Sequence, residues 1–121
     1  MSISSNMEDY ISRTKNSEWK PLNESGVDTT GLYVKPLRFD PKQQRSPAII
    51  LKFEPGASYP YHNHPAGEEI FVLKGSCFVN ESILKEGDYL YTPPGFKHGV
   101  KSETGCEMLL LIPAEVEILK K

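Results

Sequence analysis

The sequence predicts one all-β domain, folded as a barrel or a sandwich. Apolar runs of about five residues recur at intervals of about 8 to 12 residues, and no helical segment separates them. Ten prolines and nine glycines, many of them between these runs, supply turns. The 121 residues are enough for one compact domain with its own core.

Residues 1–18 are predicted to form a short helix or an arm that packs on the rest of the chain. Ser5 and Glu8 have the spacing of a capping box. Three apolar side chains would share one face of this helix: Met7, Tyr10 and Ile11. From Trp19 the pattern changes, and residues 19–121 are predicted to form the barrel.

Two early strands are predicted around Leu32–Leu37 and over Ile49–Phe53, where apolar residues alternate. Later strands are predicted in the apolar runs 69–73, 76–79, 89–91 and 106–112. Turn-forming residues separate these runs at 74–75, 80–82, 86–88, 93–95 and 104–105. This spacing favours a barrel or a sandwich over a parallel sheet.

The charge pattern gives no support for nucleic acid or a membrane as a partner. Acidic residues number 16 and basic residues 14, and neither forms a long block. The apolar runs are too short to span a bilayer, and the polar start lacks a signal-peptide core, so a cytoplasmic location is predicted. Cys77 and Cys106 are predicted to be reduced, partly buried thiols.

The three histidines of the chain have the spacing of a metal site. His62 and His64 are two apart, so on a strand both point to the same face. His98 follows a Pro-Gly turn and would supply a third nitrogen, while Glu68 or Glu69 would supply a carboxylate. Taken alone, the His62–His64 pair also fits surface histidines, and the Glu68–Glu69 pair also fits a solvated turn. Only their joint spacing with His98 favours a metal site. Such a set leaves coordination positions open for water, oxygen or a substrate.

Two segments resemble the two motifs of the cupin superfamily, also called RmlC-like proteins. GASYPYHNHPAGEEIFVLKG is similar to the first motif, with Gly56, His62, His64, Glu68 and Gly75 at its defining positions. GDYLYTPPGFKHGVKS is similar to the second, with Gly87, Pro93, Gly95 and His98 in place and Ser102 where the family often has asparagine.

The resemblance implies a double-stranded β-helix, the jelly-roll cupin barrel. It also implies one divalent metal ion, Fe(II) or Zn(II) with Mn(II) or Ni(II) as further candidates, held by His62, His64, Glu68 and His98. Family spacing selects Glu68 because the ligand stands seven residues before the closing glycine, whereas strand periodicity alone does not choose between Glu68 and Glu69. No catalytic residue beyond the metal ligands is assigned.

Residues from about Trp19 to Pro113 look most like the sensory cupin half of ChrR-type anti-sigma factors and their single-domain relatives, some of which are likened to acetylacetone-cleaving dioxygenases. Full-length anti-sigma factors of this type carry a further zinc-binding domain before the barrel. Here a short arm without His or Cys stands in that place, so sigma-factor binding is not expected. Acetylacetone-cleaving enzymes bind iron by three histidines alone, so Glu68 argues against that specific reaction.

The metal pocket is expected to be apolar and to favour small, mostly apolar ligands. Its predicted lining is Ile70, Val72, Leu90, Met108 and Leu110, and Tyr91 and Phe96 are expected near the mouth. Cys106 is a further candidate to approach the metal, although core packing is the favoured role for a buried cysteine. Arg13, Arg38 and Arg45 all lie outside both motifs, so reactions of small dicarboxylates, which favour a guanidinium beside the metal, are not expected.

Two functions from different classes follow. The first is a metal-dependent dioxygenase-type oxidoreductase that acts on a small carbonyl or diketone-like compound. The second is a non-catalytic, zinc-binding sensory or ligand-binding module related to ChrR. A homodimer, paired through strand edges or the N-terminal arm, is expected in either case.

Overall fold

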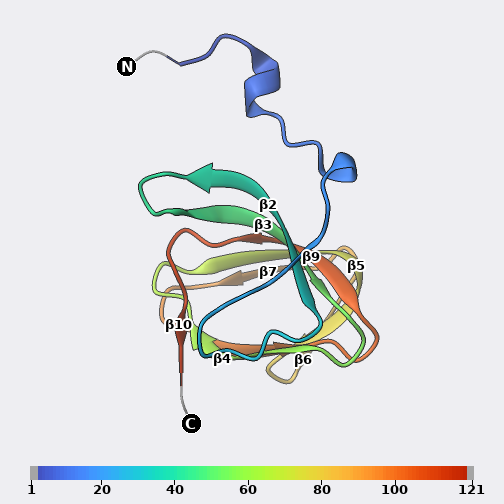
Figure 1. Ribbon diagram of the computed structural model, residues 1–121. Helices are drawn as coiled ribbons and strands as arrows, with labels where there is room; N and C mark the ends of the chain where they lie inside the picture. Colours follow the sequence, from blue (N-terminus) through green and yellow to red (C-terminus); the bar gives the residue numbers. More distant parts are fainter. Residues whose placement is uncertain (1–2, 120–121) are drawn as a thin grey trace.

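A computed structural model describes residues 3–119, which form two β-sheets packed face to face as a barrel (Figure 1). The strands are β1 (Lys20–Pro21), β2 (Leu32–Asp40), β3 (Arg45–Phe53), β4 (Ser58–Asn63), β5 (Glu68–Val79), β6 (Ser82–Lys85), β7 (Tyr89–Thr92), β8 (Lys97–Lys101), β9 (Cys106–Leu111) and β10 (Glu117–Ile118). Within the described residues no helix is long and apolar enough to cross a membrane.

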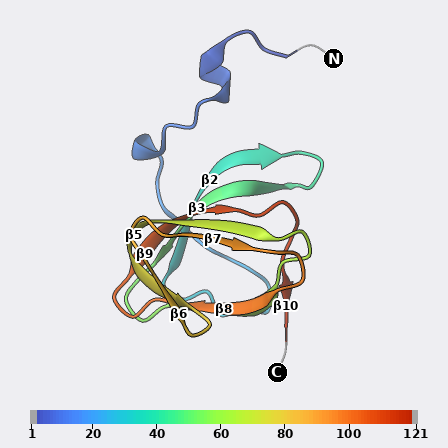
Figure 2. The same ribbon diagram turned by 180° about the vertical axis from the view of Figure 1, so that it is seen from behind.

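The long strand β5 belongs to both sheets. Its first part pairs with β9 and β7, in the sheet that continues through β3 and β2 to β1. Its last part, Ser76–Val79, pairs with β6 and β8, in the sheet that continues through β4 to β10. Figure 2 shows the same two layers from behind. These antiparallel pairings confirm the predicted jelly-roll barrel.

Alternating side chains fill the space between the sheets. In β5, Ile70 and Val72 are buried, whereas Phe71 and Leu73 point outward and are partly exposed. In β3, Leu51 and Phe53 are buried in the same core. The two early strands predicted from alternation are therefore confirmed as β2 and β3.

The N-terminal arm leads away from the barrel and contains two 3-10 turns, η1 (Met7–Tyr10) and η2 (Thr14–Asn16) (Figure 1). The predicted capping box at Ser5 is wrong, because the side chain of Asn6 accepts the hydrogen bond from the Glu8 backbone N–H. The apolar side chains of the arm are exposed in the described chain. The division into an arm over 1–18 and a barrel over 19–121, whose outer ends lie outside the described residues, stays a prediction.

Gly75 lies where β5 passes from one sheet to the other. Its φ is 76°, in the left-handed region that favours glycine. A Cβ atom at this position would lie 2.2 Å from the Gly105 carbonyl oxygen, so the position has no room for a side chain. The backbone conformation and the close approach of the β9 end therefore both require glycine.

Gly75→Ala is expected to lower the free energy of unfolding by at least about 3 kcal/mol, because backbone strain adds to the clash with the Gly105 carbonyl. Gly87→Ala is the matched control, since Gly87 has a φ of 87° but nothing within 4 Å of the added Cβ. The control should lose only about 1 to 2 kcal/mol. Urea unfolding of both variants measures the difference, and equal losses would contradict the steric argument.

Candidate metal centre

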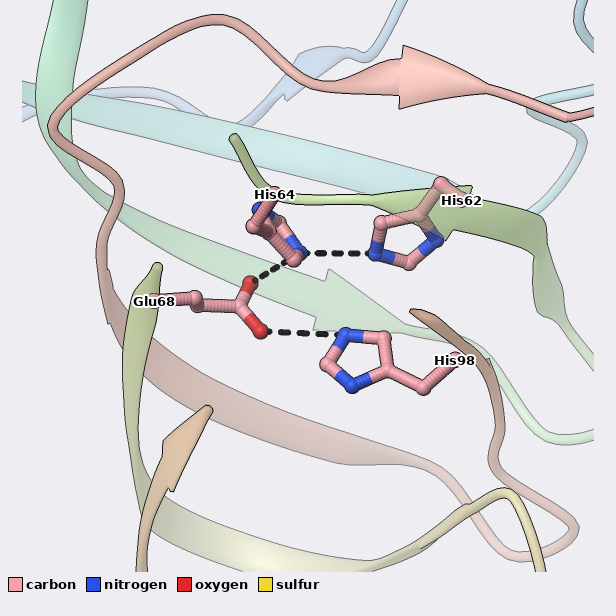
Figure 3. A group of neighbouring side chains, drawn as sticks. All are labelled: His62, His64, Glu68 and His98. Carbon is pink, nitrogen blue, oxygen red and sulfur yellow. Dashed lines mark hydrogen bonds and ion pairs between the residues drawn. The ribbon is translucent and has the colours of Figure 1, made fainter. Parts of the chain in front are cut away.

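Four polar side chains meet inside the barrel, at one end of its core (Figure 3). His62 lies near the end of β4, His64 follows that strand directly, Glu68 begins β5 and His98 lies in β8. Their side chains are almost fully buried, with residue exposures between 1% and 5%. The structure thus brings together the four residues that the sequence singled out.

The distances between their donor atoms fit a single metal ion. The Nε2 atoms of His62 and His64 are 2.8 Å apart, His64 Nε2 lies 3.2 Å from Glu68 Oε2, and His98 Nε2 lies 3.1 Å from Glu68 Oε1. Two donors about 2.1 Å from one ion and at right angles to each other are about 3.0 Å apart. All four ligand atoms lie within 4.8 Å of one another, so a single ion can contact all of them.

Unsatisfied polar atoms in the group support this fit. His98 Nε2 and Glu68 Oε1 are buried and face each other at 3.1 Å, but neither makes an aligned hydrogen bond with any described residue. A buried polar atom without a partner costs free energy, which a bound cation would offset. Three imidazole nitrogens and one carboxylate oxygen form a donor set that suits divalent iron, zinc and manganese.

A β-bulge orients His62. The register between β4 and β8 shifts between Tyr59 and His62, with Pro60 inside the shift. His62 Nδ1 lies 2.7 Å from the Pro60 carbonyl oxygen, and because a carbonyl only accepts, Nδ1 carries the proton and donates it. The lone pair of the neutral ring therefore lies on Nε2, which points to the centre of the group.

Backbone hydrogen bonds join the two motif loops at His64. Its carbonyl oxygen accepts from the N–H of Gly67 at 3.0 Å and from that of Gly95 at 3.2 Å. Gly95 belongs to the turn that leads into His98, so the same carbonyl ties both histidine-bearing loops together. Gly67 has a φ of 80°, which turns the chain back into β5 and delivers Glu68.

Burial and the neighbouring groups set the protonation states of the site. Burial lowers the pKa of His62 to about 4, although the hydrogen bond to Pro60 opposes this shift. Burial also tends to raise the pKa of Glu68, but the adjacent His64 and His98 outweigh it and hold that pKa below its usual range. A neutral imidazole and an ionised carboxylate are the forms that bind metal.

The other candidates lie apart from this group. Glu69 points to the opposite face of β5, where its carboxylate accepts a hydrogen bond of 2.6 Å from the Tyr89 hydroxyl. Cys77 and Cys106 are buried free thiols that interact with each other. Their mutual hydrogen bond raises the pKa of Cys77 and lowers that of Cys106.

A cavity of about 430 Å³ opens in front of the group and has a mostly apolar wall. His62, His64 and Glu68 line it, together with Ile70, Met108 and Leu110 as predicted. Val72 and Leu90 do not line it. Tyr91 and Phe96 are also misplaced by the prediction, because they line a smaller hollow of about 250 Å³ beside His98.

Five polar residues of the cavity were missed by the sequence analysis: Glu24, Arg45, Ser46, Tyr59 and Glu115. Arg45 lines the cavity although it lies outside both motifs, so distance along the sequence was a poor guide to its place. Its guanidinium donates to the Ile112 carbonyl at 2.8 Å and to Gln43 at 3.1 Å. Tyr59 could have been suspected from Pro60, since a proline within a strand pattern signals a bulge that changes which face a side chain takes.

The barrel and its buried His-His-Glu-His group define a cupin with a site able to hold a metal ion. A family model described as the ChrR cupin-like domain matches residues 7–114. The chain therefore belongs to the ChrR cupin-like family, and the resemblance to the cupins is confirmed.

Individual relatives share parts of this chain. The (R)-mandelonitrile lyase of Granulicella tundricola is 30% identical over 61% of this chain and 64% of its own length. The chain spans less than two thirds of the length of the curated relatives it matches.

Solved structures show the same fold at low identity. The polyketide cyclase RemF of Streptomyces resistomycificus has a TM-score of 0.74 at 20% identity, over 91% of this chain and 84% of that one. An acetylacetone dioxygenase of Acinetobacter johnsonii has a TM-score of 0.71 at 19% identity, over 98% and 78%. The fold thus occurs in proteins with different activities.

Metal-stripped protein is expected to lose stability as the pH falls from about 6.5 toward 4. Over this range the unfolded chain binds a proton at His62 that the folded chain excludes, so the free energy of unfolding falls by up to about 1.4 kcal/mol per pH unit. Urea unfolding across this range measures the slope. His62→Gln, which does not titrate, should give a flatter curve, and equal slopes would contradict the assignment.

Proposed function

We propose that this chain is a metal-dependent cupin enzyme of the dioxygenase type, acting on a small carbonyl or diketone-like compound. The observation that carries the proposal is the buried group of four donors, three of which, His62, His64 and Glu68, lie at the wall of a cavity whose remaining surface is mostly apolar. The likeness of the fold to an acetylacetone dioxygenase gives further support.

In this proposal His62, His64, Glu68 and His98 hold the metal. A bound Fe(II) ion would act as a Lewis acid toward the carbonyl oxygen and allow reaction with dioxygen, and with both oxygen atoms entering the products no external reductant is needed. Ile70, Met108 and Leu110 would surround the substrate and keep water out. The Pro60 carbonyl would hold the His62 ring in the orientation that ligation requires.

The second candidate is a zinc-binding sensory or ligand-binding module, favoured by the match to the ChrR cupin-like domain. The same four residues would hold Zn(II), which has no redox chemistry. Metal content after purification without added metal, together with oxygen uptake of iron-loaded protein over a panel of diketones and aryl ketones, separates the two. Tight zinc with no oxygen uptake across the panel would favour the sensory module.

Glu68→Gln is expected to lower oxygen uptake by more than it lowers the metal content. The amide keeps the shape of the side chain but removes one negative charge, which makes a bound Fe(II) ion harder to oxidise. His98→Ala should instead lower the metal content directly, because it deletes a nitrogen donor. Elemental analysis and oxygen-electrode assays measure both quantities.

Glu69→Gln is the matched control for these two variants. Glu69 is the neighbour of Glu68 in the sequence, but its carboxylate points to the other face of β5 and contacts Tyr89. It should leave both metal content and oxygen uptake close to the wild type. A Glu68→Gln protein that loses metal and oxygen uptake in equal proportion would argue against the dioxygenase assignment.

We also infer a cytoplasmic homodimer, as the sequence predicts, but one paired through a sheet face instead of the strand edges or the N-terminal arm. Apolar and aromatic side chains gather on the outer face of the sheet that contains β5, β7 and β9, with exposures between 38% and 56%. This patch consists of Phe71, Tyr89, Tyr91 and Leu111. Glu69 lies among these side chains, opposite Tyr91 and Leu111, and a cluster of exposed aromatic and apolar side chains around a single charged group is compatible with a protein interface, where aromatic residues are enriched.

Sedimentation velocity should show a dimer for the wild type and a monomer for Phe71→Lys, because the variant replaces the aromatic ring between Tyr89 and Leu109 by a charged group whose burial is costly. Ile83→Lys, an exposed apolar position on β6, serves as the control and should stay dimeric. A monomeric wild type at micromolar concentration would refute the dimer.

A further inference from the structure

Tyr59 and Glu24 form a polar pair on the cavity wall, outside the group that can hold a metal. The Tyr59 hydroxyl lies 2.8 Å and 2.9 Å from the two carboxylate oxygens of Glu24. Both side chains line the cavity and both are partly buried. The Tyr59 ring meets the His62 ring edge-on, with 4.9 Å between ring centres, so the pair lies next to the metal group.

The backbone builds this pair from two separate segments. The β-bulge at Pro60 allows Tyr59 and His62 to share the cavity side although they are three residues apart, a spacing that regular alternation would place on opposite faces. Glu24 lies on the loop before β2, whose ends are held by the hydrogen bonds from Leu22 N–H to the Leu32 carbonyl and from Glu54 N–H to the Gly31 carbonyl, each 2.9 Å.

The numbers of hydrogen-bond donors and acceptors on Tyr59 and Glu24 determine which ligand groups can bind to the pair. A phenol has one proton, and Tyr59 donates it to Glu24. An ionised carboxylate has no proton to donate. The remaining capacity of the pair therefore consists of acceptor positions only, on the phenol oxygen and on the two carboxylate oxygens.

Most of the remaining cavity wall is apolar, unlike the Tyr59–Glu24 pair. The wall near the pair includes Leu22, Val100 and Val116. Arg45, a cation of the same wall, donates to the Ile112 carbonyl and to Gln43 through Nη1 alone, which leaves the N–H groups of Nη2 and Nε as further donors. Glu115 adds a third carboxylate to the lining, after Glu24 and Glu68. At the Tyr59–Glu24 pair itself a ligand carboxylate would be repelled by the Glu24 carboxylate, whereas an ether oxygen would leave the acceptors without a donor.

We propose that the Tyr59–Glu24 pair selects ligands that carry a hydroxyl or neutral N–H donor at a distance from the carbonyl group. This inference rests on the proposed function, in which the carbonyl lies at the metal. The substrate class is thereby narrowed from small apolar carbonyl compounds to ketones with a separate hydroxyl or amino group. Tyr59 and Glu24 act in binding and discrimination.

A matched ligand series tests the pair in the metal-loaded, full-length protein. Binding of acetophenone, 3′-hydroxyacetophenone, 3′-aminoacetophenone and 3′-methoxyacetophenone is measured by calorimetry under nitrogen, so that no turnover occurs. The meta position prevents the substituent from chelating the metal together with the carbonyl. Wild type is expected to bind the hydroxyl and amino ketones about tenfold more tightly than the methoxy ketone.

Two variants and one control assign this preference to the pair. Glu24→Gln places an amide donor on the wall and should reduce the preference to about twofold or less. The double variant Tyr59→Phe with Glu24→Leu makes the wall apolar and should abolish it while retaining acetophenone binding. Glu115→Gln removes a carboxylate from the same cavity but leaves the pair intact, so it should keep the preference.

The outcomes separate this inference from the proposed function. A wild type that binds acetophenone but shows no preference among the four ketones overturns the inference alone. The same holds if Glu24→Gln and the double variant keep the full preference. A wild type that binds none of the four ketones overturns both the proposed function and the inference that rests on it.

Discussion

An ionised carboxylate inside an apolar barrel must be paired, because the desolvation of a lone charge costs several kcal/mol. Glu68 is 5% exposed, and three imidazoles surround it within the same small volume. Each strand end that supplies one of these groups is therefore held to a narrow range of positions. β4, β5 and β8 come from both sheets, so the convergence of the four side chains also fixes how the two sheets meet at this end of the barrel.

Small backbone features make this convergence possible. Pro60 cannot donate a hydrogen bond to the β4–β8 ladder, and its bulge turns its carbonyl toward His62. The His64 carbonyl accepts from two backbone N–H groups and ties the first motif to the second. Prolines and glycines within the two cupin-like segments thus shape the site without supplying a donor atom to it. Their spacing along the sequence is informative because these residues set the backbone turns that orient the ligand side chains.

Much of the barrel and the composition of the metal group could be predicted from the sequence, whereas most of the cavity could not. Alternation in 49–53 follows local periodicity, 69–73 is a continuous apolar run that predicts a strand but not its buried face, and the histidine spacing matches a motif whose glycines fix the turns between ligands. Tyr59 escaped because a bulge reverses the face expected from its position. Glu24 and Arg45 escaped because loop and hairpin residues reach the cavity through tertiary packing, for which periodicity carries no information. The N-cap of the first 3-10 turn was predicted at Ser5 but is Asn6. Neighbouring polar residues compete for the same N–H groups, and the sequence alone does not show which one binds them.

The cavity wall has two chemically different polar parts. One part can bind a metal ion, and the other can recognise a hydrogen-bond donor of a ligand. The first part carries the His-His-Glu group, whose donors suit a cation and, through it, an oxygen atom of a ligand. The second part carries Tyr59 and Glu24, whose acceptors suit a hydrogen-bond donor. A shared ligand set among cupins fixes the first interaction, while the second depends on one bulge and one loop, which lie outside that ligand set. Changes in such wall residues can therefore alter the ligand that is recognised without altering the fold, and the same fold does occur in a cyclase and in a dioxygenase.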